Sequence, residues 1–248
     1  MKITLLDDDK LAQEVDEILE ISRWNNLFKM AVIAAIIMAI MIPVQVLVFL
    51  VYPPPSSVEG FFRLFNENAF VGLLEYDFLM IFDMLLITFI YLALYFLLKN
   101  INESMITVAL VLGLLGIASF FASNTSLEML SLSKQFAAAT TSEQRMILRA
   151  AGLALIETYN GTSFTIYYSL SAISLLVFSF AMLKNKIFTK ANAYAGLITG
   201  LFMVIPPIAI IGKVGLFSSL IALLPLEIWL ILFAKNLKKL NRKAFRAY

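Results

Sequence analysis

Residues 73–98 read LLEYDFLMIFDMLLITFIYLALYFLL, a nearly unbroken apolar run in which Asp83 lies close to the centre. About 20 apolar residues in a helix cross the roughly 30 Å hydrocarbon core of a bilayer. The run is longer than that, which predicts a membrane-spanning helix that tilts or protrudes. A carboxylate at the bilayer centre costs roughly 2.5–3.5 kcal/mol on insertion scales, so Asp83 is expected to face the protein interior.

The rest of the chain has the same character. Of the 248 residues, 61% are hydrophobic and 15% are charged, whereas a soluble domain is about half apolar and a quarter charged. Six stretches are long enough to span a bilayer, which predicts an all-α polytopic membrane bundle with six transmembrane helices. The predicted spans are Leu27–Tyr52, Leu73–Leu98, Ser104–Ser123, Thr165–Leu183, Ala191–Gly212 and Gly215–Ala234.

The distribution of basic residues predicts the orientation. Lys and Arg gather on the cytoplasmic side of membrane proteins. Fourteen of the 19 basic residues precede or begin the first span, lie in the turns between spans two and three or four and five, or belong to the C-terminal tail. Both termini are therefore predicted to be cytoplasmic, in a multi-pass protein of the cell's inner membrane. A juxtamembrane basic tail favours lipid headgroups rather than nucleic acid as its contact.

Three regions follow from these assignments. Residues 1–26 are predicted to hold a short cytoplasmic amphipathic helix, with acidic residues at its start and apolar residues at helical spacing. Residues 27–234 form the six-helix membrane domain, and residues 235–248 form the basic cytoplasmic tail.

Two segments outside the bilayer are predicted to be helical. Val58–Phe65 is rich in phenylalanine and is expected to be a half-buried helix at the interface. Residues 124–163 contain two capping-box patterns, beginning at Thr125 and Thr141, which predict an extracytoplasmic helical hairpin. Met146, Ala150, Leu153 and Ile156 or Glu157 would give its second helix an apolar inner face, and the hairpin would act as a lid or as a passive cap.

The polar residues inside the spans are the candidate site. Asp83 and Glu227 lie about a dozen residues below the outer ends of spans two and six, so they are expected at similar depth. Tyr76 lies seven residues before Asp83, on the same face of a continuous helix, and Gln45 lies within span one. Prolines that free backbone carbonyls in spans one, five and six suggest a polar central cavity. These helix-break residues are Pro43, Pro206, Pro207 and Pro225.

Several catalytic classes are excluded. The chain has no Cys and no His, which removes disulfides, thiolate nucleophiles and sites that need an imidazole. No metal site and no cofactor are expected. Tyr76-Asp77 matches half of an intramembrane aspartyl protease signature, but the Gly-x-Gly-Asp half is missing.

The leading hypothesis is therefore a non-enzymatic protein that binds or moves a small ligand, lipid or cation at Asp83 and Glu227. A structural or accessory membrane protein, whose acids serve packing alone, is the first alternative. An intramembrane carboxylate-dependent hydrolase is the second. Gly196 and Gly200 form a Gly-x-x-x-Gly pattern, which is compatible with close helix packing or with a homo-oligomer.

The sequence resembles a family of prokaryotic six-span membrane proteins catalogued as domain of unknown function 4386. Three stretches carry the resemblance: residues 68–95, residues 123–162 and residues 182–196. The first includes Asn68-Ala69-Phe70-Val71-Gly72, and the third includes Ala193-Tyr194-Ala195-Gly196. The resemblance implies six helices in a prokaryotic inner membrane, and it implies no particular activity.

Overall fold

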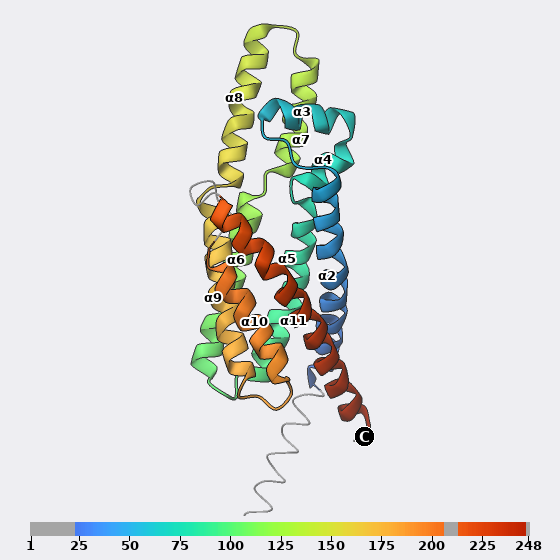
Figure 1. The fold of residues 1–248 in the computed structure, drawn as a ribbon, viewed down its shortest axis with the longest axis vertical. Coiled ribbons are helices and arrows are strands. Elements are labelled where there is room, and N and C mark those ends of the chain that lie inside the picture. Colours follow the sequence, from blue (N-terminus) through green and yellow to red (C-terminus); the bar gives the residue numbers. More distant parts are fainter. Residues whose placement is uncertain (1–22, 206–212, 247–248) are drawn as a thin grey trace, which may run out of the picture.

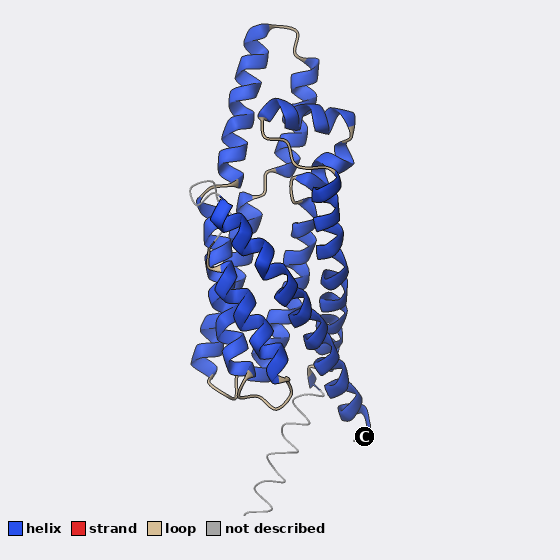
Figure 2. Cartoon of the chain, in the orientation of Figure 1, coloured by secondary structure: helices blue, strands red, loops and turns tan. Residues whose placement is uncertain are grey.

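A computed structural model describes residues 23–205 and 213–246. Within these ranges the chain is entirely helical and contains no strand (Figure 2). Residues 1–22 hold most of the predicted amphipathic helix and lie outside the described part, as do Pro206 and Pro207. The described helices are α2 (Asn25–Val51), α3 (Val58–Glu67), α4 (Ala69–Glu75), α5 (Phe78–Leu98), α6 (Glu103–Ser123), α7 (Ser126–Ala138), α8 (Ser142–Tyr159), α9 (Thr162–Met182), α10 (Lys190–Met203) and α11 (Lys213–Arg246).

Five helical stretches of the described residues are long and apolar enough to cross a membrane, which supports a multi-pass membrane protein. The third stretch comprises α6 together with α7, and the fourth comprises α8 together with α9. Helix α10, where the fifth of six spans was predicted, has 14 described residues and is shorter than a span. The five stretches are Asn25–Val51, Phe78–Leu98, Glu103–Ala138, Ser142–Met182 and Phe217–Arg242.

Six of the described helices pack as a closed ring. Helix α2 packs on α5, α5 on α6, α6 on α9, α9 on α10, α10 on α11, and α11 returns to α2. Helix α11 runs obliquely across one face of this ring in Figure 1. Buried side chains from all six helices form one apolar core, in which Ile90, Phe120, Phe178 and Trp229 are almost fully buried. The apolar side chains on the outer side of α2, such as Ile33 and Ile40, are exposed and suited to contact lipid.

Small residues allow the helices of the ring to approach closely. Gly113 of α6 lies against Tyr91 and Ser174, and Gly200 of α10 lies against Leu176. Gly196 is the tightest, because a Cβ atom there would lie 2.0 Å from Ser179 Oγ and 2.8 Å from the Trp229 ring. The Gly-x-x-x-Gly pair is therefore used within the chain and is buried between its neighbours, rather than exposed as a dimer surface.

Helices α3, α4, α7 and α8 form a second unit at one end of the ring (Figure 1). They have their own apolar core, whose fully buried members are Val58, Phe62, Phe65, Tyr76 and Met129. Helix α3 packs on α7 and α8, so its predicted aromatic face covers protein rather than lying free at a membrane interface.

The hairpin predicted over residues 124–163 forms, with differences in its details. The capping box at Thr141 is present, and Gln144 closes it. At the first helix Thr125 makes no side-chain cap, because Asn124 Oδ1 accepts from the Ser126 backbone N–H instead.

On the predicted inner face of α8, Met146 and Leu153 are instead 66% and 51% exposed, whereas Ile156 packs against the outer core. Gly152 is buried in their place. A Cβ atom there would lie 2.5 Å from Val58 Cγ1, so the missing side chain lets α3 approach this face of α8.

Gly196→Ala should destabilise the ring. The added methyl group would overlap Ser179 and Trp229, and overpacking of this kind costs about 1–3 kcal/mol. We expect a lower thermal midpoint, followed through the tryptophan fluorescence of the purified protein in detergent. Leu201→Ala, at a side chain 65% exposed on the same helix, is the matched control. An unchanged midpoint in Gly196→Ala would contradict this packing.

Candidate functional site

The helix predicted to run unbroken through residues 73–98 is interrupted at Tyr76 and Asp77. Asp77 has φ 55° and ψ 31°, in the left-handed region, and it is the one non-glycine residue with positive φ in the described chain. Aspartate tolerates this conformation better than most side chains. Asn124 Nδ2 lies 3.4 Å from the Tyr76 carbonyl and 3.3 Å from the Asp77 carbonyl, and donates to both.

The interruption takes Tyr76 away from the predicted site. Its ring is 2% exposed and lies in the outer core, 5.1 Å from the Phe61 ring and 4.9 Å from the Tyr159 ring between centroids. Its hydroxyl lies 3.3 Å from Thr125 Oγ1. Tyr76 therefore does not share a helical face with Asp83, and its contacts are those of a packing residue.

Asp77, rather than Tyr76, is the residue at the interruption that acts electrostatically on Asp83. Tyr159 OH donates to Asp77 Oδ2, and Gln45 Nε2 lies 3.5 Å from Asp77 Oδ1 and 2.8 Å from the Leu74 carbonyl oxygen. These bonds join α2, α5 and α8 at the outer end of the ring. Burial, partly opposed by the hydrogen bond from Tyr159, raises the pKa of Asp77 to about 6.

Glu75 is the functional candidate that sequence reasoning missed. It ends α4, before the span begins at Phe78, and is 5% exposed. Neither of its carboxylate oxygens has a hydrogen-bond partner. Burial, and then the neighbouring charge of Asp77, raise its pKa to about 7. The available signal was a second acid two residues before Asp77 at the start of an apolar run.

Asp83 and Glu227 lie within the spans, as predicted. Asp83 is 6% exposed, and its Oδ1 atom is buried without a hydrogen-bond partner. Glu227 Oε1, on α11, is in the same condition. Glu227 and Asp77 are the charged groups that act electrostatically on Asp83, although α5 and α11 share no extensive packing. The two predicted acids form no hydrogen bond with each other, and the structure connects them only through the electrostatic effect of Glu227 on Asp83.

Phenol groups from α9 line the same region. Tyr167 is 5% exposed and lies within electrostatic range of both Asp77 and Asp83. Tyr168 is within range of Asp77, and its ring centroid lies 5.1 Å from that of Tyr167. Gln45 completes the set, since its Oε1 atom is buried without a partner. The interior thus offers carboxylates, phenols and one amide.

Of the four predicted helix-break prolines, the two that are described lie inside helices. Helix α2 continues through Pro43 and α11 continues through Pro225, so neither residue ends a helix. The interruption that matters for the site is the left-handed Asp77.

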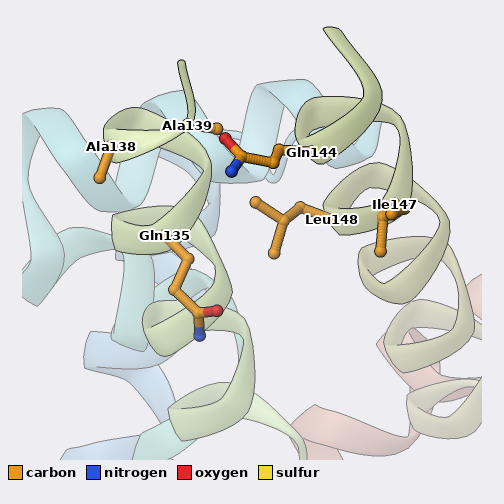
Figure 3. A pocket seen from close by; sticks show the side chains of 6 residues that line it. All are labelled: Gln135, Ala138, Ala139, Gln144, Ile147 and Leu148. Carbon is orange, nitrogen blue, oxygen red and sulfur yellow. The ribbon is translucent and has the colours of Figure 1, made fainter. Parts of the chain in front are cut away.

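A groove of about 400 Å³ opens between α7 and α8, next to the turn that joins them (Figure 3). No carboxylate lines it. Leu148 and Ile147 supply apolar surface, while the Gln144 side chain already accepts from the backbone of the turn. The groove shares no residue with the predicted polar site.

In the part of the chain that the structure describes, no group of three acidic side chains is close enough to hold a metal ion. Comparison with protein-family models, with curated proteins and with solved structures gives no match. The resemblance to domain of unknown function 4386 therefore stays a prediction, and the site must be interpreted from its own chemistry.

Glu75→Gln should reduce the dependence of stability on pH. The folded chain retains the Glu75 proton up to about pH 7, while an unperturbed glutamate releases it near 4.5. Stability is therefore lost as pH rises through this window. At pH 8 we expect the midpoint of Glu75→Gln to exceed that of the wild type by roughly 2–4 °C, the effect of about 1 kcal/mol in a chain of this size.

Thermal unfolding from pH 5 to pH 8 tests this, with the exposed Glu157→Gln as control. If the thermal midpoints of wild type and Glu75→Gln change with pH by the same amount, the prediction is wrong, because Glu75 would then titrate in the folded protein as it does in the unfolded chain.

Proposed function

We propose that this multi-pass membrane protein binds and moves a small cation through the interior of its helical ring, with Asp83 and Glu227 as the binding residues. The single observation that supports this most directly is that Asp83 Oδ1 and Glu227 Oε1 are buried without any partner. Acids that serve packing alone would be expected to have donors, since an unsatisfied buried acceptor costs about 1–3 kcal/mol.

The chemistry of the interior favours a positively charged solute. The unpartnered oxygens of Gln45, Asp83 and Glu227 are all acceptors, and a cation or a donor is what satisfies an acceptor. The one ion pair between described side chains joins Arg149 to Glu59 on the outer unit. No described Lys or Arg therefore neutralises the acids of the ring.

We further propose six spans, with α10 as the fifth in chain order. Helix α10 occupies a place in the ring between α9 and α11, and the chain stays apolar beyond its described end as far as Ile211. The ends of the ring differ in charge. The start of α2, the turn between α9 and α10 and the C-terminal part of α11 lie at the end opposite the α7–α8 hairpin (Figure 1). These segments carry Arg23, Lys29, Lys186 and Lys239, which supports cytoplasmic termini and an extracytoplasmic hairpin.

Single cysteine substitutions test this topology. The wild-type chain contains no cysteine, so any maleimide labelling comes from the introduced residue. In intact cells, a membrane-impermeant maleimide should label Ala150→Cys on α8. It should label Lys186→Cys and Lys239→Cys only after the membrane is opened. If α10 does not cross the membrane, α11 would cross it in the opposite direction from the one proposed. Lys239→Cys would then be labelled in intact cells, while Lys186→Cys would stay protected.

The cation function is tested with purified protein in liposomes on a solid-supported membrane, where charge movement is recorded after jumps in Na⁺, K⁺ or H⁺ concentration. We expect wild-type protein to respond to at least one of these ions. Asp83→Asn and Glu227→Gln should each reduce the response by about tenfold or more, since each removes an ionisable oxygen from the path.

Glu143→Gln, on the exposed side of α8, is the control and should behave as wild type. Responses of Asp83→Asn and Glu227→Gln equal to wild type, or no response to any of the three ions, would leave the structural or accessory role as the better interpretation.

A further inference from the structure

In the described chain, no helix continues across the boundary between the ring and the outer unit of α3, α4, α7 and α8. The chain crosses this boundary from α2 to α3, from α4 to α5, from α6 to α7 and from α8 to α9, and each crossing is a break in the helix. A few residues at the end of a helix can absorb large changes in φ and ψ, so breaks of this kind are suited to act as hinges. The non-helical residues are 52–57, 76–77, 124–125 and 160–161.

The two units also have separate apolar cores. The core of the outer unit is built around Phe62, Phe65 and Tyr76, and the core of the ring is a distinct cluster. Helix α4 packs on α2 and α5 of the ring, and α8 packs on α9, the helix that follows it. Because each unit buries its own apolar side chains, each can keep its packing while the angle between the units changes.

Three of the breaks are tied to one another by hydrogen bonds. Asn124, in the break between α6 and α7, donates from Nδ2 to the carbonyl oxygens of Tyr76 and Asp77 in the break between α4 and α5. Thr125 Oγ1, next in the chain, lies 3.2 Å from the carbonyl oxygen of Leu155 and donates to it from the same break to α8. These segments are therefore expected to move together as one hinge.

Two further hydrogen bonds hold the units together across the boundary. Gln45 of α2, in the ring, donates from Nε2 to the carbonyl oxygen of Leu74 in α4, at 2.8 Å. Tyr159, which ends α8 in the outer unit, donates to Asp77 Oδ2 at the start of α5. The Tyr159 ring centroid also lies 5.5 Å from that of Phe164 in the core of the ring. We call the bonds of Gln45 and Tyr159 the latch.

The closed arrangement leaves polar atoms at this junction without partners. Glu75, which follows Leu74, is 5% exposed, and neither of its carboxylate oxygens has a hydrogen-bond donor. Gln45 Oε1 is also buried without a partner. A buried acceptor lacks the hydrogen bonds that water would supply. Water that enters an opened junction would therefore offset part of the cost of breaking the latch, which brings the closed and open forms closer in free energy.

We propose that the outer unit is a hinged lid on the ring, that the latch bonds of Gln45 and Tyr159 hold it closed, and that its opening admits water to Glu75 and Asp77. The lid goes beyond the cation-moving function proposed above and does not rest on it. Its motion is a property of the chain alone, so it is measured without any ion gradient.

The experiment measures the distance between two spin labels on the full-length protein in lipid nanodiscs. Val108→Cys on α6 reports on the ring and Ala150→Cys on α8 reports on the outer unit, since both side chains are exposed. We expect one main distance when the latch is intact. Tyr159→Phe and Gln45→Met should each increase the population outside that distance by about three- to tenfold, the effect of one lost hydrogen bond on an equilibrium.

Two controls separate the lid from general loosening. Thr158→Ala removes a hydroxyl from the same helix that bonds the Ala154 carbonyl within α8, so it should keep the wild-type distances. A second pair of labels, at Val108→Cys and at Ile40→Cys on α2, lies within the ring and should give the same distance in every variant. Wild-type distances in both latch variants, or an equal broadening of the pair within the ring, would overturn the proposal.

Access of water to the junction is tested by the reaction of Glu75→Cys with a charged methanethiosulfonate reagent. Tyr159→Phe should speed this reaction by about the factor by which it increases the open population. Ala93→Cys, at a position fully buried in the core of the ring, should react slowly with or without Tyr159→Phe. If Tyr159→Phe lengthens the distances but leaves the Glu75→Cys rate unchanged, the outer unit moves without opening the junction, and the lid is wrong.

Discussion

The arrangement of this protein depends on one backbone constraint, the left-handed conformation of Asp77. It ends one helix and starts another within an apolar run that would otherwise form a single helix. The cost of a residue in this region is about 1–3 kcal/mol and persists only where the surroundings compensate. Here Asn124 satisfies two carbonyls, and Tyr159 and Gln45 hold the carboxylate. Asp77 therefore connects the outer unit to the ring.

Because the chain turns at this point, the two apolar cores separate. Tyr76 joins the outer core with Phe62 and Phe65, while the residues from Met80 onward join the core of the ring. The acids lie along the boundary and inside the ring, with Glu75 and Asp77 at the junction. The outer unit thus covers the end of the ring at which Glu75 and Asp77 lie.

Much of the fold could be predicted from hydropathy, since a bilayer demands long apolar helices and the sequence contains them. The position of Asp83 and Glu227 within such helices followed from the same argument, and the capping box at Thr141 followed from its sequence pattern. The interior site was harder. The periodicity that placed Tyr76 beside Asp83 assumes an unbroken helix, and no proline or glycine marks the interruption at Asp77. The face of α8 was decided by the packing of Gly152 on Val58, which hydropathy does not reveal.

Glu75 illustrates why a carboxylate can matter more than its sequence context suggests. A polar side chain buried without a partner reduces stability, so a surface position would be the cheaper place for it. The fold instead encloses Glu75 next to a second acid that adds repulsion. Such an arrangement is typical of functional sites, where perturbed ionisable groups are retained although they destabilise the protein. The same reasoning applies to Asp83 and Glu227, because each has an unpartnered oxygen buried within the ring at the cost of stability that a buried acceptor without a donor brings.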